Sequence, residues 1–375
     1  METFDVAVVG MGALGSAAAF HLARKGVRVI AFEQFDLGHV RGASHDTSRI
    51  IRTSYGATHY VRLAKSAYRD WADLENVAGE RFVTTTGGLV FFPAHGPVRA
   101  DDFTSSLGSA GVPYELLSTA EVHARWPQFR LPDDVRTVYT PDSGIVHASR
   151  SVTALQMQAR AHGAVIRDRT PVQRLSPGDS GVVLHTADAD VHAGKVILAT
   201  DAWANRLLEP LGAGIALVTM QEQVTYFKPA DPGAFDRARF PVWIWDDASC
   251  FYGFPTYGEP TVKAGRDVSN NLMSPEERTF VPSPELLAQL SSFMTDVIPR
   301  SGPPLRTVTC QYALTPGRRF VISALPEHPD IIVGLGAGHA FKFTPAIGRI
   351  LAELACDGDT SDDISPFGVP APAST

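Results

Sequence analysis

The sequence predicts a mixed α/β fold with two domains. The chain has 375 residues, more than one compact core usually holds, and its 44% hydrophobic and 19% charged residues are ordinary for a globular protein. A βαβ unit with a glycine-rich turn opens the chain within the first forty residues. Further short apolar runs and a late helix follow it, so a sheet covered by helices is the expected architecture.

Charge and cysteine content exclude several classes of protein. The net charge is −7, whereas nucleic-acid binding normally needs a basic field, so no nucleic acid is expected as a partner. The absence of an 18-residue apolar run argues against a membrane span. Cys250, Cys310 and Cys356 form no CxxC pair, so we expect no metal site and no disulfide framework. This cysteine usage is typical of a reduced compartment, and the first residues predict a strand and not a signal peptide, so a cytoplasmic location is expected.

The opening βαβ unit predicts dinucleotide binding. Its parts follow in order: a strand over residues 4–9, a GxGxxG turn, a helix over 17–24, a stop at Gly26 and a strand over 27–32. Gly10 permits the tight turn, Gly12 lets a pyrophosphate approach the backbone, and Gly15 lets helix and strand pack closely. Glu33 ends the second strand and can accept hydrogen bonds from an adenosine ribose. The motif does not separate FAD from NAD, and a glycine-rich turn without a ligand is the alternative.

A short segment after this unit carries a pair of arginines. Asp46, Thr47 or Ser48 could cap a short helix. On that helix, Arg49 and Arg52 would share a face at i and i+3. Neighbouring guanidinium groups repel unless an anion lies between them, and a reduced flavin or a substrate carboxylate would supply one. The local alternative is a pair of solvated surface arginines.

Later apolar runs predict further strands. They lie at residues 163–172, at 182–186 and 191–196 as a hairpin, at 196–200 before a turn to residue 203, and at 331–335. Gly334, Gly336 and Gly338 allow close approach of a ligand to the backbone. Thr344 can cap a helix that begins at Pro345 and runs to about residue 356, with its positive end free for an anion.

These segments together resemble the monomeric sarcosine oxidase and N-methyltryptophan oxidase family. Pipecolate oxidases and the piperideine-carboxylate oxidase of nikkomycin biosynthesis are relatives. The resemblance rests on blocks in the family's order: the βαβ unit, Ser44-His45-x-x-x-Arg49-Ile50-Ile51-Arg52-x-x-Tyr55, Tyr252-Gly253-Phe254-Pro255, Lys263, Cys310-Gln311-Tyr312 and Gly338-His339-Ala340-Phe341-Lys342-Phe343. They span nearly the whole chain.

The resemblance implies a glutathione-reductase-like, FAD-binding Rossmann domain and a second, mixed β-sheet domain for the substrate. Both would be discontinuous in sequence. The FAD domain would comprise residues 1–85, 146–212 and 306–375, and the substrate domain residues 86–145 and 213–305. The family also suggests a monomer.

The resemblance assigns roles around the flavin. Cys310 matches the cysteine that forms a thioether to the flavin; without the resemblance, a lone cysteine is more often a packing residue. Lys263 matches the lysine that activates oxygen, because a fixed positive charge stabilises superoxide. Arg49 matches a residue beside the flavin ring, and His45 and His339 match histidines near it. Ser44, Gly338 and Lys342 complete the predicted cofactor contacts.

The resemblance also places a substrate site. Arg52 and Lys342 match the pair that holds the substrate carboxylate, where arginine can donate parallel hydrogen bonds and lysine adds a point charge. Tyr252 and Tyr312 match aromatic residues of the substrate pocket. One position departs from the sarcosine oxidases, which carry a histidine four residues beyond the lysine; this chain has Asp267. An acid there would favour a cationic amine or a cyclic imine, or it pairs with a neighbouring cation at the surface.

The implied function is oxidation of a secondary or cyclic amino acid by FAD and O₂, giving an imine and hydrogen peroxide. Three alternatives stay open. A flavin dehydrogenase would pass electrons to another acceptor, an NAD-dependent dehydrogenase would hold no flavin, and a non-catalytic FAD-binding protein would oxidise nothing. The set of cations formed by Arg49, Arg52, Lys263 and Lys342 argues against the last alternative, because a scaffold has no need of those charges.

Overall fold

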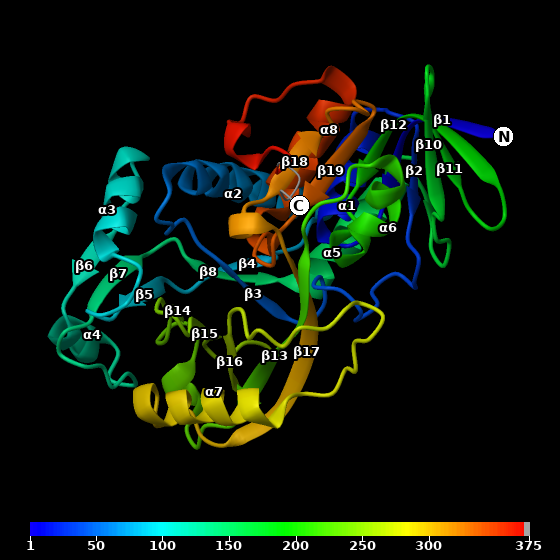
Figure 1. Ribbon diagram of the computed structural model, residues 1–375. Coiled ribbons are helices and arrows are strands. Elements are labelled where there is room, and N and C mark those ends of the chain that lie inside the picture. Colours follow the sequence, from blue (N-terminus) through cyan, green and yellow to red (C-terminus); the bar gives the residue numbers. More distant parts are fainter. Residues whose placement is uncertain (371–375) are drawn as a thin grey trace.

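The computed structural model describes residues 1–370 and contains two large β-sheets with a small one between them. Figure 1 shows the first sheet with α1, α5 and α8 in the upper part of the molecule and the second sheet above α7 in the lower part. The small sheet formed by β3, β8 and β4 lies between them. This architecture confirms the predicted mixed α/β fold.

The first sheet has eight strands, five of which run parallel through its centre. Its order is β10-β11-β12-β1-β2-β9, and β19 pairs with β12 and with β18. The strands are β1 (Glu2–Val9), β2 (Val29–Phe32), β9 (Val165–Arg167), β10 (Arg174–Gly178), β11 (Gly181–His185), β12 (Asp190–Leu198), β18 (Val321–Ala324) and β19 (Ile331–Leu335). The predicted hairpin and the strand at 331–335 are confirmed, whereas only residues 165–167 of the segment 163–172 form a strand.

Three helices flank the first sheet, and α1 packs against both of the others. They are α1 (Ala13–Arg24), α5 (Ala148–Ala161) and α8 (Thr344–Asp357). Helix α1 is the predicted one but begins earlier, directly after Gly12. The prediction that Thr344 caps α8 is wrong: the cap position is Phe343, at the end of the 3-10 turn η5 (Phe341–Phe343). The helix continues from that turn, and the Thr344 hydroxyl has no partner in the described chain.

The second sheet also has eight strands, and its two faces meet different surroundings. Its order is β17 (Pro304–Leu314), β13 (Val218–Phe227), β16 (Val262–Arg266), β15 (Phe251–Phe254), β14 (Val242–Trp245), β5 (Gly88–Phe92), β7 (Arg136–Thr140) and β6 (Glu115–Leu117). One face packs on α7 (Pro284–Val297), where Phe293 stacks on Trp243 and Phe251. Because side chains alternate along a strand, Tyr252 and Lys263 project from the other face.

The small sheet pairs β3 (Ser48–Ile51) and β4 (Val83–Thr85) with β8 (Gly144–His147). The predicted short helix bearing Arg49 and Arg52 is therefore wrong. The β-branched Ile50 pairs with Ile145 and fits a strand better than a helix. The remaining helices are α2 (Thr58–Ala78), α3 (Ala100–Ser109), α4 (Thr119–Arg125) and α6 (Ala204–Leu208). No helix within residues 1–370 is long and apolar enough to cross a membrane.

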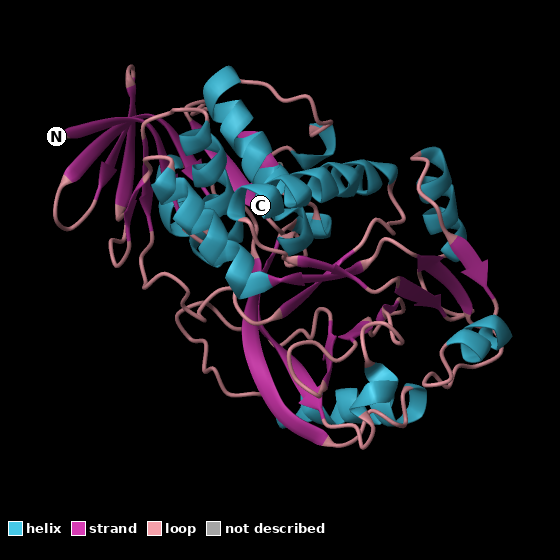
Figure 2. Ribbon diagram, turned by 180° about the vertical axis from the view of Figure 1, so that it is seen from behind, coloured by secondary structure: helices cyan, strands magenta, loops and turns pink. Residues whose placement is uncertain are grey.

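The division into domains stays a prediction, and the long strands suggest one adjustment. Strand β17 pairs with β13 over almost its whole length in the second sheet. Figure 2, seen from behind, shows this long strand curving from the lower sheet towards the helices of the upper part. We therefore propose that the boundary drawn at residue 306 belongs after Leu314.

Candidate active site

One large cavity of about 1110 Å³ lies between the two parts of the molecule. Its wall combines the glycine turn after β1, the segment before β3, the free face of the second sheet and the segment before α8. The predicted site residues that line it are Gly10, Gly12, Glu33, Ser44, His45, Arg49, Arg52, Tyr252, Lys263, Asp267, Cys310, Tyr312, Gly338, His339 and Lys342. Gly15 is the one predicted site residue that does not line the cavity; it lies where α1 approaches the end of β1.

The glycine turn has the shape that a dinucleotide requires. Gly10 has φ +93°, and a Cβ there would lie 2.5 Å from the Ala199 carbonyl oxygen. A Cβ on Gly15 would lie 1.8 Å from the Gly10 carbonyl oxygen, so the helix could not approach the strand. Helix α1 begins at this turn with no side-chain cap on Gly12 and no acidic residue in its first turn. Its N-terminus is therefore suited to phosphate.

Glu33 connects the end of β2 to the same turn. Its carboxylate accepts hydrogen bonds from the Met11 N–H at 2.9 Å and the Phe35 N–H at 3.1 Å, and the residue is 5% exposed. Ser44 supports the turn from the opposite side, because its hydroxyl accepts a hydrogen bond from the Ala13 N–H at 2.9 Å. These residues fit an adenine dinucleotide, with a carboxylate at the ribose position and backbone N–H groups for the phosphates.

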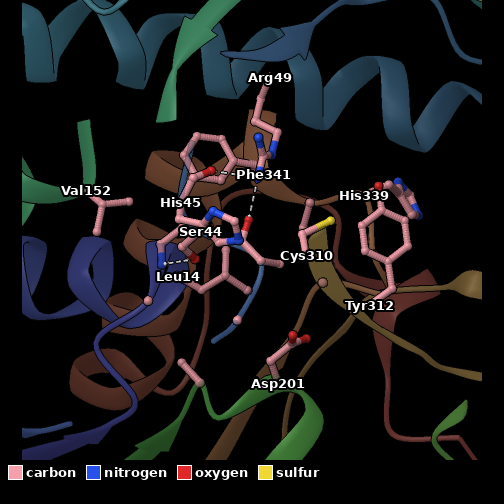
Figure 3. Close-up of a pocket in the computed structure, with 18 of the residues that line it drawn as sticks. Leu14, Ser44, His45, Arg49, Val152, Asp201, Cys310, Tyr312, His339 and Phe341 are labelled. Atoms are coloured by element: carbon pink, nitrogen blue, oxygen red, sulfur yellow. Dashed lines mark hydrogen bonds between the residues drawn. The ribbon is translucent and has the colours of Figure 1, made fainter. Parts of the chain in front are cut away.

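Arg49 and Arg52 both line the cavity, although they do not share a helical face. The Arg49 guanidinium donates to the carbonyls of Ala43 at 2.9 Å, His45 at 2.8 Å and Ser48 at 3.0 Å. Figure 3 shows Arg49 beside Phe341 and above His45. Backbone carbonyls thus fix this cation in place without neutralising it. Burial lowers the pKa of His45 to about 4, so that imidazole is neutral.

Arg52 and Lys342 form a cationic pocket beside aromatic rings. The Arg52 guanidinium lies 4.3 Å from the centre of the Tyr55 ring, and its Nε has no partner in the described chain. The Lys342 ammonium lies 5.8 Å from the same ring and donates to the His339 carbonyl at 2.9 Å. Burial, reinforced by Arg52, lowers the pKa of Lys342 to about 7. An anion bound here would restore its positive charge.

Lys263 is buried on β16 and makes an ion pair that the sequence did not reveal. Its ammonium donates to Asp46 Oδ2 at 2.6 Å, to the Ser48 carbonyl at 3.0 Å and to the Ser48 hydroxyl at 3.1 Å. Asp46 also accepts a hydrogen bond from the Tyr226 hydroxyl at 2.7 Å. Burial lowers the pKa of Lys263 to about 8, and Asp46 opposes this shift. Asp46 is adjacent to His45, but local sequence suggested only a helix cap.

Cys310 and the two tyrosines lie on the cavity face of the second sheet. Figure 3 shows the Cys310 sulfur and the Tyr312 ring facing the cavity. Burial raises the pKa of the Cys310 thiol to about 11, while Arg49 lowers it. Small residues make room for the rings: a Cβ on Gly265 would lie 2.8 Å from the Tyr252 hydroxyl, and one on Gly338 would lie 2.8 Å from the Tyr312 ring.

Asp267 pairs with a cation that the sequence analysis missed. It makes a two-point ion pair with Arg318, at 2.9 and 3.1 Å, and does not pair with Arg266 or Lys263. Arg318 ends the 3-10 turn η4 (Pro316–Arg318), and its carbonyl is hydrogen-bonded to His339 Nε2 at 3.0 Å. Its place after Pro316 and Gly317 is typical of a turn, so no local signal marks it as a cavity residue.

A sequence model of the family described as FAD dependent oxidoreductase matches residues 5–354. The chain belongs to this family.

Curated relatives in this FAD-dependent oxidoreductase family match almost the full chain. A monomeric sarcosine oxidase from Streptomyces avermitilis is 35% identical over 380 residues, covering 97% of each protein. A monomeric sarcosine oxidase from Bacillus sp. (strain NS-129) is 31% identical over 372 residues, covering 98% of this chain and 96% of the relative. The predicted resemblance is thus confirmed.

A solved structure has the same fold. NikD, described as an unusual amino acid oxidase essential for nikkomycin biosynthesis, is 29% identical with a TM-score of 0.87. The match covers 100% of this chain and 99% of NikD. The protein is therefore an FAD-dependent oxidoreductase, and the predicted flavin cofactor class is confirmed, which excludes the NAD-dependent alternative.

Proposed function

We propose that the protein oxidises a secondary or cyclic amino acid, of the N-methyl or pipecolate and piperideine-carboxylate type, to an imine with release of hydrogen peroxide. One observation carries the proposal. A single cavity combines a dinucleotide turn with the Arg52 and Lys342 cations and with Lys263. The relatives' names, sarcosine oxidase and amino acid oxidase, support the same substrate class.

The residues of the glycine turn, Glu33 and Ser44 would hold the adenosine diphosphate part of FAD, and Cys310 would attach its ring through a thioether. Bound FAD would supply the redox chemistry by accepting a hydride equivalent from the substrate and passing two electrons to O₂. Arg49 fits the role of the fixed cation near the ring, because carbonyls hold it without an ion pair closer than 4.0 Å. His45, which is buried, and His339, which is half-buried, would contribute shape and neutral hydrogen-bonding groups.

The substrate would bind at the end of the cavity away from the part that would hold the adenosine diphosphate of FAD. The Arg52 Nε–H has no partner among residues 1–370, and Lys342 has an ammonium group nearby, so together they can hold a carboxylate. Tyr252 and Tyr312 would cover the substrate and exclude water. The neutral amine is the form that can lose a hydride equivalent, and the protein's main contribution is to hold its C–H bond in position.

Lys263 would assist the reaction with O₂. A buried ammonium favours the first electron transfer because superoxide is an anion in a poorly solvated site. The protein would act as a monomer, in line with the name of its sarcosine oxidase relatives. Its three unpaired cysteines suit a reduced, cytoplasmic compartment.

The direct test is anaerobic mixing with candidate substrates while flavin absorbance is followed. The panel would contain N-methyl amino acids, proline, pipecolate and piperideine carboxylate. We expect at least one of them to bleach the flavin, and peroxide to form when air is admitted. A panel without any bleaching would contradict the proposed substrate class and revive a non-catalytic role.

A second candidate is a flavin dehydrogenase that uses an acceptor other than O₂. The ion pair between Asp46 and Lys263 favours it, because a carboxylate at 2.6 Å weakens the field that the ammonium presents to superoxide. The two candidates differ in the fate of the electrons. Bleached enzyme that recovers slowly in air but rapidly with an artificial electron-accepting dye would support the dehydrogenase.

A further inference from the structure

Asp201 places a carboxylate next to the glycine turn. It begins the 3-10 turn η1 (Asp201–Trp203) after the end of β12, and its φ of +45° is in the left-handed region, which aspartate and asparagine tolerate better than most residues. The preceding backbone already touches the turn, since the Ala199 carbonyl lies against Gly10. Figure 3 shows the Asp201 carboxylate directed into the cavity, on the side of Leu14 and Cys310.

This carboxylate has no side-chain partner in the described chain. Burial raises the pKa of Asp201 to about 7, and only the backbone N–H of Ala202 opposes the shift. Asp201 is only partly exposed, towards the cavity, so an ionised carboxylate there is poorly hydrated and has no counter-charge among the described residues. The free protein therefore holds this group near the midpoint of its titration at neutral pH.

The surrounding elements supply no cation to Asp201. Strand β17 and helix α6 pack against η1, and their titratable side chains are Arg306, Cys310, Tyr312 and Arg206. Arg306 is paired with Glu259, and Arg206 is paired with Glu276. Cys310 and Tyr312 are neutral because burial raises the pKa of each. Glu33, at the same end of the cavity, would add only negative charge.

A bound dinucleotide would bring further negative charge to this end of the cavity. The helix N-terminus and the glycine turn would receive its diphosphate, and a second anion beside that group would be repelled. A protonated carboxyl group, in contrast, offers an O–H donor. We propose that Asp201 binds the cofactor as a neutral carboxylic acid, donating a hydrogen bond to an oxygen of FAD, so that FAD binding takes up one proton. The inference requires the FAD cofactor but not the proposed substrate.

The sign of the pH dependence follows from linkage. Below about pH 6 Asp201 is protonated with or without FAD, so affinity does not change with pH. Above pH 7 the free protein loses this proton and binding must restore it. The affinity then falls by up to tenfold per pH unit, which gives roughly a 50-fold loss between pH 7 and pH 9, because half of the free protein is already deprotonated at pH 7.

The test measures FAD binding and proton uptake, not turnover. Full-length protein with Cys310→Ala, which cannot retain flavin covalently, is titrated with FAD from pH 6 to pH 9 and examined by calorimetry in buffers of different ionisation enthalpy. We expect the predicted loss of affinity and uptake of one proton at pH 8. Asparagine tolerates the same backbone conformation, so Asp201→Asn should bind FAD without this pH dependence and without uptake of a proton. Asp201→Gly should behave in the same way.

The matched control is Asp188→Asn on an exposed turn, which should keep the full pH dependence. Affinity that is constant or rises with pH, or proton uptake that persists in both Asp201 variants, would overturn the inference. Failure to bind FAD at any pH would overturn the cofactor assignment as well, so the two failures are distinguishable.

Discussion

The ammonium of Lys263 lies 2.6 Å from Asp46 Oδ2, and Lys263 is only 3% exposed. The other oxygen of Asp46 is hydrogen-bonded by the Tyr226 hydroxyl at 2.7 Å. The cation that we propose to assist O₂ is therefore held by a carboxylate from a segment more than two hundred residues earlier. Both its orientation and its charge depend on this partner.

The first prediction concerns the pH dependence of the oxygen reaction. Burial lowers the pKa of Lys263 to about 8 while Asp46 opposes the shift. Lysine is charged below its pKa, so we expect the rate constant for reoxidation of reduced enzyme to fall as pH rises through about 8. Lys263→Met should lower this rate constant roughly 10²- to 10³-fold at pH 7, as measured by stopped-flow mixing with O₂.

Asp46→Asn extends this test, because it removes the charge that favours the ammonium form. The fall in rate should then move to lower pH, while the reductive half-reaction changes little. Asp142→Asn serves as the control, since Asp142 accepts from Thr53 and does not line the cavity. An unchanged profile in Asp46→Asn would show that Asp46 does not maintain the charge.

The second prediction concerns the substrate carboxylate. Arg52→Met removes the charge-assisted contact to the substrate carboxylate. Even one such hydrogen bond contributes about 1.5–3 kcal/mol, so the substrate Kd should rise at least roughly 10- to 150-fold. Anaerobic titration of flavin absorbance gives this Kd directly. Arg266→Met is the matched control, because the Arg266 guanidinium bonds Ser249 and Gln289 away from the cavity. Equal effects of both substitutions would exclude Arg52 as the carboxylate anchor.

The third prediction concerns covalent attachment of the flavin. Acid-precipitated protein should keep its yellow flavin, and Cys310→Ala should release it. Cys250→Ala should retain it, although Cys250 also lines the cavity. Because burial raises the pKa of the Cys310 thiol to about 11, attachment to FAD added to apoprotein should become faster from pH 7 to pH 9. Release of the flavin from unsubstituted protein would refute the thioether.

The fourth prediction concerns the ion pair between Asp267 and Arg318. The side chains are 22% and 33% exposed, so solvent moderates their attraction. Asp267→Asn or Arg318→Met alone should lower the free energy of unfolding by about 1–2 kcal/mol, because each leaves a charge without its partner. The double substitution should cost less than the sum, as measured in urea. The exposed pair of Arg150 and Glu80 should show almost no coupling.

The fifth prediction uses two glycines with similar backbone angles. Gly10→Ala should abolish FAD binding, because its Cβ would lie 2.5 Å from the Ala199 carbonyl oxygen at φ +93°. Gly26 has φ +80° but nothing within 4 Å of a Cβ. Gly26→Ala should therefore lower stability modestly and leave FAD binding intact. Loss of binding in both variants would indicate a general folding defect.

Patterns over a few neighbouring residues correctly predicted those parts of the fold that depend on neighbouring residues alone. The glycine spacing after β1 sets the turn, and Gly10 and Gly15 lie where the motif requires. The helix predicted around Arg49 was wrong, because this segment forms a strand in which Ile50 pairs with Ile145, a residue far away in the sequence. Signals for local helix capping could not reveal that a distant strand would pair with this segment.

The cavity residues were predictable from resemblance, but their partners were not. Lys263 and Cys310 both line the cavity, and the family pattern had marked them. The pairing of Lys263 with Asp46 and of Asp267 with Arg318 depends on how distant loops meet. Aspartate and arginine are common at surfaces, so nothing in the local sequence distinguishes such buried pairs from solvated ones.

The close packing of α8 against α1 has a consequence for assembly of the cavity. A Cβ on Gly348 would lie 2.3 Å from the Ala17 Cβ, so the two helices meet almost backbone to backbone. Gly10 and Lys342, which come directly before these two helices in the sequence, both line the cavity. The docking of α8 on α1 therefore brings together two walls from distant parts of the sequence, and we expect a folding intermediate in which these helices have not yet met to be unable to capture flavin.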